Sequence, residues 1–276
     1  MPKSDFTNNF EEEPVAEFQF VRYRIEDYVG RLTLQRPPVN ALSRQLVSEI
    51  FAAAHLANRD AERRELRAMI LNAEGNHFCA GADLKERQGV PEAEVEKVVQ
   101  GIREAIQAIA DIKVPVIAAV QGTAAGGGME LALAADIRVL AETSKMGLRE
   151  TALAIIPGAG GTQRLMRLIG YSRALEWIAT ARMFDANECL AHGIANRVVP
   201  ETELPDAALY FAKQIAVNGP IAVQASKEAM RRGMDEPLSR ALEIEFECYK
   251  RVIPTKDRRE ALAAFAEKRT PVFKGD

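Results

Sequence analysis

Residues 115–140 read PVIAAVQGTAAGGGMELALAADIRVL, and the fold class follows from this stretch. Pro115–Val120 is a short apolar run, as expected of a buried strand. A glycine-rich turn follows, then a predicted helix at Gly127–Ala134 and another buried strand at Ile137–Leu140. Strands that alternate with helices are typical of parallel strands joined by crossovers, so the stretch predicts an α/β architecture.

The chain on the N-terminal side continues this alternation. Ser43 has the side chain of an N-cap, and it precedes a predicted helix whose apolar face includes Leu46 and Ile50. A second helix is predicted from about Pro91 to Ile112, with apolar residues at helical spacing. Strands are predicted at Phe18–Ile25, Val29–Leu34 and Ala68–Leu71, with a turn at Glu26–Asp27.

The last part of the chain has a different character, because residues 201–276 hold only helical patterns. Residues 1–14 are polar and acidic and are expected to form a flexible arm. We therefore predict three parts: an N-terminal arm at 1–14, an α/β core at 15–200 and a helical C-terminal region at 201–276.

Composition excludes several classes of function. The 276 residues hold 36 Lys+Arg against 39 Asp+Glu, a net charge of −3, which argues against a protein that neutralises nucleic acid or coats an anionic membrane. No apolar run reaches the roughly 18 residues of a membrane span. The three histidines form no H-x-x-x-H motif, so no zinc site is predicted. Scattered cysteines at Cys79, Cys189 and Cys248 indicate buried thiols in a reducing compartment, which predicts a cytoplasmic protein.

The glycine-rich turn at 121–130, QGTAAGGGME, is the first candidate site. Glycines between a strand and a helix let a ligand approach the backbone, and the free N–H groups of the helix attract an anion. This turn does not match a nucleotide-binding loop. A P-loop needs Lys at position 128, where Gly stands, and a dinucleotide-binding motif needs Gly at position 131, where Leu stands. A plain tight turn is the alternative. Glu130 lies one helical turn beyond Gly127, so its carboxylate and that free N–H are expected to face one cavity.

Two further turns follow predicted buried segments. FCAGADLK at 78–85 has small residues that admit a ligand, with Asp83 as the cap of the next turn; a structural helix start explains it equally well. In MGLRETALAIIPGAGGTQRL at 146–165, Glu150 precedes an apolar stretch, which raises a carboxylate pKa toward neutrality and suits proton transfer. The alternative is an exposed loop glutamate.

Taken together, these motifs resemble the enoyl-CoA hydratase/isomerase (crotonase) superfamily from about Phe18 to the C-terminus. CAGADL, AAGGGMELALAADIRV and GLRETALAIIPGAGGTQRL stand in the family's order. The resemblance is closer to the methylglutaconyl-CoA hydratase (AU-binding homologue) branch through NALS at 40–43, FCAGADLKER at 78–87 and IPTKDRREALAAFAEKR at 253–269. It implies a spiral of ββα units with a helical C-terminal region that forms a trimer or a dimer of trimers.

The resemblance also implies an activity and its residues. The matching oxyanion-hole donors are the amides of Ala82 and Gly127, and the two matching carboxylates are Glu130 and Glu150. We expect reversible syn addition of water to a 2-trans-enoyl-CoA, with Glu130 activating the water and Glu150 supplying the proton to C2. The alternatives are a 3-methylglutaconyl-CoA hydratase and a Δ3,Δ2-enoyl-CoA isomerase, for which one carboxylate suffices.

The implied partners are an acyl-CoA thioester and further copies of the chain. No metal or other cofactor is implied. Arg149 departs from the uncharged residue expected there in many relatives, and a substrate carboxylate is one partner it could bind.

The branch name also raises RNA binding, but Arg59–Arg67 mixes four arginines with three acids and predicts a solvated, self-paired face. CoA contacts are expected from Ala82, Asp83, Leu84, Lys85 and Gly127, and from Phe265 and Lys268 of a neighbouring subunit.

Overall fold

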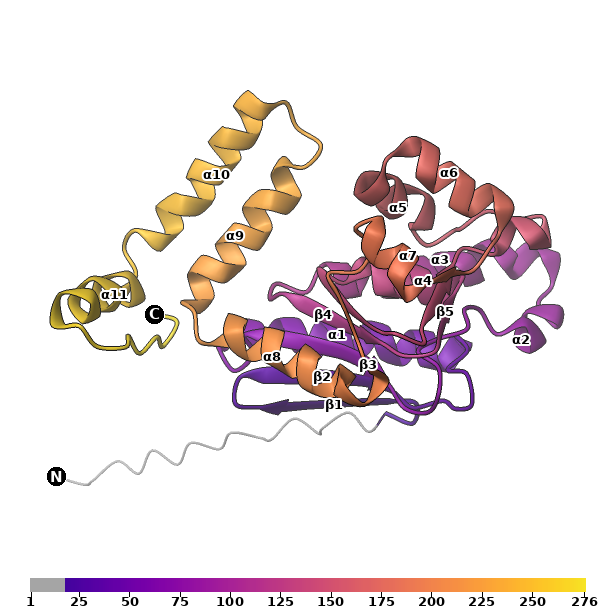
Figure 1. The fold of residues 1–276 in the computed structure, drawn as a ribbon, viewed down its shortest axis with the longest axis horizontal. Coiled ribbons are helices and arrows are strands. Elements are labelled where there is room, and N and C mark those ends of the chain that lie inside the picture. Colours follow the sequence, from indigo (N-terminus) through magenta and orange to yellow (C-terminus); the bar gives the residue numbers. More distant parts are fainter. Residues whose placement is uncertain (1–17) are drawn as a thin grey trace, which may run out of the picture.

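The computed structural model describes residues 18–276, so the predicted arm at 1–14 lies outside the described part. A six-stranded sheet with the order β1-β2-β3-β4-β6-β9 forms the centre (Figure 1). β1 and β2 pair antiparallel, and every other neighbouring pair is parallel, as predicted. Its strands are β1 (Val21–Glu26), β2 (Val29–Leu34), β3 (Ala68–Ala73), β4 (Val116–Val120), β6 (Ile137–Ala141) and β9 (Arg197–Val199).

The first strand begins at Val21 and not at Phe18 as predicted. The reason is a competing acceptor, because the backbone N–H groups of Gln19 and Phe20 donate to the Glu49 carboxylate at 3.1 and 2.6 Å. This carboxylate therefore ties the entry of the strand to the helix that holds Glu49.

A second, three-stranded sheet with the order β5-β7-β8 was not predicted. β5 (Thr123–Ala125) follows β4, and β7 (Lys145–Gly147) follows β6, so each long strand leads into a short one and then into helical turns. β8 (Phe184–Asp185) completes the sheet. The outcome is a spiral of strand–strand–helix units, which agrees with the expected fold.

Helices cover both faces of the large sheet. On one face, α1 (Arg44–Glu62) and α3 (Glu92–Ala110) pack with the larger apolar core, and the Ser43 side chain caps α1 as predicted by accepting from Leu46 N. On the other face, α8 (Leu204–Ala216) packs on alternate residues of the strands, including Ile70, Ile117 and Val139. The helix predicted from Pro91 to Ile112 is α3, one residue shorter at its start and two at its end.

The remaining helices fall into two groups. Beyond α8, the last three helices project away from the sheet (Figure 1); they are α9 (Pro220–Gly233), α10 (Leu238–Val252) and α11 (Lys256–Glu267). They expose large apolar side chains, among them Leu238, Phe246 and Phe265. Their predicted role in assembly stays a prediction. The other helices are α2 (Leu84–Gln88), α4 (Gly127–Ala134), η1 (Glu150–Leu153), α5 (Gly161–Ile169), α6 (Tyr171–Thr180), α7 (Ala186–Ala191) and η2 (Glu201–Glu203).

The arginines of Arg59–Arg67 correct one expectation. Arg67 is buried, stacks over the Tyr28 ring at 3.8 Å and donates to the carbonyl oxygens of Ala216 and Phe273. Arg64 donates to Gly275 O at 3.1 Å. The predicted self-paired, solvated face is therefore wrong for these two residues, which hold the C-terminal tail against the core.

The three cysteines are free and buried, as predicted. Among residues 18–276, no helix is long and apolar enough to cross a bilayer.

Candidate active site

The four predicted catalytic and oxyanion residues meet in one cleft with a volume of about 740 Å³. Ala82 stands before α2, Gly127 and Glu130 lie on the first turn of α4, and Glu150 begins η1. The opposite wall is apolar. It consists of Val95, Val99 and Ile102 from α3 and Leu153, Ile155 and Ile156 near η1.

The backbone around Ala82 directs its N–H group into this cleft. Leu42 N donates to Gly81 O at 2.8 Å, and Asp83 N donates to Leu42 O at 3.2 Å. Leu42 and Ala82 form a parallel bridge, whose hydrogen bonds are made by the two neighbours of Ala82 in the chain. The N–H of Ala82 itself therefore points away from Leu42. Among the described residues, that N–H has no acceptor.

Gly127 supplies the second free N–H because it is the first residue of α4, where no intrahelical acceptor exists. The preceding Gly126 has a φ of +54°, which favours glycine, and its N–H donates to Gly147 O at 2.8 Å. A Cβ added to Gly127 would lie 3.8 Å from Ala82 N. The two amides therefore stand side by side.

Glu130 is held rigidly at the bottom of the cleft and is only 3% exposed. Its Oε1 accepts from the backbone N–H groups of Ala159 and Gly161, both at 2.8 Å. Burial raises the pKa of Glu130 above its ordinary value, while the two N–H donors and the charge of Arg164 act in the opposite direction. With Oε1 engaged, Oε2 is the oxygen left to accept a proton.

Glu150 is the more weakly held carboxylate of the pair. Its Oε2 is buried and has no hydrogen-bond partner within the described residues. A Cβ added to Gly126 would lie 3.1 Å from Oε1, so the carboxylate lies over the oxyanion turn. Burial, together with the charge of Glu130, raises the pKa of Glu150 to about 7. A pKa near neutrality suits a group that both gives and takes a proton.

The residues expected to contact CoA are not all in the cleft. Leu84 lines it, whereas Asp83 caps α2 and forms an ion pair with Arg36 at 2.7 Å. Lys85 is exposed on α2. Phe265, 85% exposed, belongs to α11, and Lys268 is the C-cap of that helix; α11 lies on the opposite side of the molecule from α2 in Figure 1. Contacts from a neighbouring subunit stay a prediction.

Three functional features escaped the sequence analysis. The Ala159 and Gly161 amides fix Glu130, and no motif indicated them because they reach Glu130 only in the folded chain. Arg164 donates to Ala159 O at 2.8 Å and to the Gln107 side chain at 2.7 Å, which secures the loop that carries those donors. A signal existed for Arg164, since it lies one helical turn beyond Gly161.

Comparisons with known proteins agree with this geometry. The profile described as enoyl-CoA hydratase/isomerase matches residues 24–276. The chain belongs to this family. It is 47% identical over 242 residues to the human mitochondrial methylglutaconyl-CoA hydratase, with 86% of this chain and 70% of that protein covered.

Two further family members show the same relation. An enoyl-CoA isomerase/hydratase of Mycosarcoma maydis is 41% identical over 254 residues, with 90% of this chain and 93% of that protein covered. The crystal structure of an enoyl-CoA hydratase from Bacillus anthracis superposes with a TM-score of 0.89 at 45% identity, covering 94% of this chain and 100% of that one. The fold is therefore that of the crotonase family, as the motifs indicated.

Proposed function

We propose that this protein is an enoyl-CoA hydratase that adds water reversibly and with syn geometry to a 2-trans-enoyl-CoA. The observation that carries the proposal is the meeting of two free backbone amides with two carboxylates in one partly apolar cleft. Hydration creates negative charge on the thioester oxygen and moves two protons. The amides suit the charge, and the carboxylates suit the protons.

In the forward direction, the thioester oxygen accepts hydrogen bonds from Ala82 N and Gly127 N. Glu130 takes a proton from water as the water oxygen bonds to C3, and the electron pair of the double bond moves onto the thioester as an enolate. Glu150, in its protonated form, then gives its proton to C2 as the carbonyl reforms. A proton returns from Glu130 to Glu150 through the next water, because two close carboxylates titrate as a pair. Preorganised donors of this kind are typically worth about 3–4 kcal/mol each.

Crotonyl-CoA tests the proposal through the ultraviolet absorbance of its conjugated thioester. We expect the absorbance to fall with the wild-type enzyme, and the rate to fall by two or more orders of magnitude in Glu130→Gln and in Glu150→Gln. Both replacements keep the size of the side chain. Unchanged rates in both variants would contradict the assigned roles.

A carboxylated substrate such as 3-methylglutaconyl-CoA is the second candidate. Arg87 and Arg149 line the cleft, and neither guanidinium has an ion-pair or hydrogen-bond partner among residues 18–276. If Arg149 binds a substrate carboxylate, Arg149→Ala lowers kcat/KM for 3-methylglutaconyl-CoA about tenfold or more relative to crotonyl-CoA. An unchanged ratio would remove this candidate.

The Δ3,Δ2-isomerase reading has less support, because moving one proton needs only one carboxylate and this cleft holds two. For the proposed addition no metal or other cofactor is needed, since the two amides stabilise the enolate. CoA contacts by Asp83, Lys85 and a neighbour's Phe265 and Lys268, assembly as a trimer or hexamer, and a cytoplasmic location complete the proposal. RNA binding is not part of it.

A further inference from the structure

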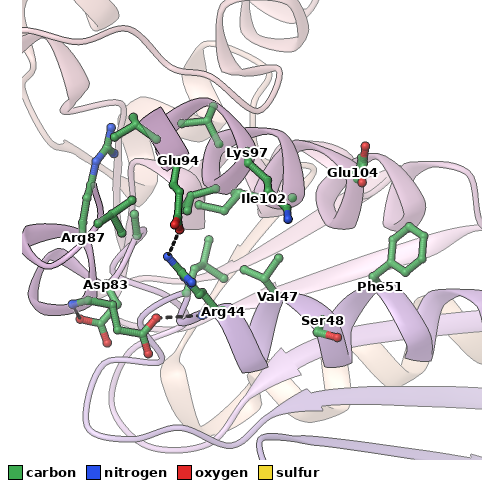
Figure 2. A pocket seen from close by; sticks show the side chains of 18 residues that line it. Arg44, Val47, Ser48, Phe51, Asp83, Arg87, Glu94, Lys97, Ile102 and Glu104 are labelled. Atoms are coloured by element: carbon green, nitrogen blue, oxygen red, sulfur yellow. Dashed lines mark hydrogen bonds and ion pairs between the residues drawn. The ribbon is translucent and has the colours of Figure 1, made fainter. Parts of the chain in front are cut away.

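A second hollow lies beside the catalytic cleft, between α1 and α3 (Figure 2). Its volume is about 360 Å³. Val47 and Phe51 of α1 face Ile102 of α3 across it, and Val98 of α3 lines it as well. We call this hollow the α1–α3 groove. These side chains give the groove an apolar strip, which suits a hydrocarbon ligand.

The groove and the catalytic cleft meet along one stripe of α3. Val95, Val99 and Ile102 line both hollows, and they recur at the spacing of one helix face. Ala82, whose amide is assigned to the thioester oxygen, also lines both. An apolar chain that starts at the thioester and follows this stripe passes from the cleft into the groove without leaving apolar surface.

The groove is also lined by charged residues from α1, from α2 with its N-cap, and from α3: Arg44, Asp83, Glu86, Arg87, Glu94, Lys97 and Glu104. Arg44 of α1 forms an ion pair with Glu94 of α3 at 3.4 Å, and the backbone N–H of Arg44 donates to the Glu86 carboxylate at 2.9 Å (Figure 2). Both partners of the ion pair are more than half exposed, so the pair is weak and contributes at most about 1 kcal/mol. This ion pair can thus break when a chain enters. The charged residues along the groove are four acids and three bases, a balance that does not favour a phosphate.

We propose that the α1–α3 groove binds the distal part of a long acyl chain and makes this enzyme selective for long acyl-CoA thioesters. The inference rests on the proposed function for its ligand class. It places C2 and C3 between the two glutamates, the next carbons on the α3 stripe and the chain end between Val47 and Val98.

Binding of saturated thioesters tests this placement without turnover. We would measure Kd for butyryl-CoA, lauroyl-CoA and free CoA by calorimetry with wild type, Val47→Trp, Val98→Trp and the control Gln100→Trp. Val47 and Val98 line the groove but not the cleft, and Gln100 lies on α3 outside both. Each buried methylene strengthens binding roughly fourfold, so displacing four of them weakens lauroyl-CoA about 200-fold relative to butyryl-CoA.

The expected result is this selective weakening in both groove variants, with Gln100→Trp close to wild type. An unchanged ratio of lauroyl-CoA to butyryl-CoA affinity in both groove variants would overturn the inference. Equal weakening of lauroyl-CoA, butyryl-CoA and free CoA would also overturn it, because the groove would then hold part of CoA. Circular dichroism identifies a variant that fails to fold, and the other tryptophan variant then decides. A wild type that binds lauroyl-CoA this way but does not hydrate crotonyl-CoA would defeat the proposed function alone.

Discussion

Replacing Gly127 by proline removes one proposed oxyanion donor and puts the ring Cδ in the place of its hydrogen. Gly127 is the first residue of α4, a position where proline is tolerated because its missing N–H has no helical acceptor. The preceding Gly126 has no Cβ, which relieves the usual restriction before proline. Loss of one such donor costs about 3–4 kcal/mol, so we expect kcat for crotonyl-CoA to fall by at least 10²–10³.

Gly127→Ala is the matched control for this variant. Both substitutions add a Cβ, which lies 3.0 Å from Leu42 Cδ1, but only alanine keeps the N–H group. The assay is the loss of crotonyl-CoA absorbance, with thermal unfolding as the check that both variants fold. Alanine and proline variants of equal activity would refute the assignment of this amide.

Further predictions concern pH and stability. Arg164→Met removes a charge that lowers the pKa of Glu130, so the acidic limb of the pH–rate profile moves to higher pH; an unmoved limb would contradict this. Because Glu150, with a pKa of about 7, must be protonated to donate, hydration slows above pH 7, and Glu150→Gln abolishes that pH dependence in its residual rate. Gly128→Ala places a Cβ 2.0 Å from Cys79 O and costs about 3 kcal/mol in urea unfolding; a wild-type midpoint would contradict the packing.

The long elements could be predicted from the sequence because their patterns are local. α4 has the predicted ends, Gly127 and Ala134, because a glycine-rich turn precedes it and a strand pattern follows it. The three strands of the small sheet were missed because each has three residues or fewer, too few for a period to emerge. Their pairing depends on contacts between distant segments.

The candidate site divides in the same way. Glu130 and Glu150 carry their chemistry in their side chains and could be named from the motifs. The partners of Glu130 are backbone groups at 159 and 161, which become donors only after α5 packs against α4. The α1–α3 groove arises from the packing of two helices that are separated in the chain by residues 63–91, so no local motif indicated it.

Isotope labelling tests most directly the central claim that this cleft adds water across C2 and C3. Crotonyl-CoA would be incubated with the enzyme in H₂¹⁸O and the product analysed by mass spectrometry and chirality. The account predicts 3-hydroxybutyryl-CoA with one ¹⁸O atom at C3, formed by the wild type and at a greatly reduced rate by Glu130→Gln. If a 3-enoyl-CoA is converted to its 2-enoyl isomer while no ¹⁸O enters any product, the cleft moves protons only and the account is wrong.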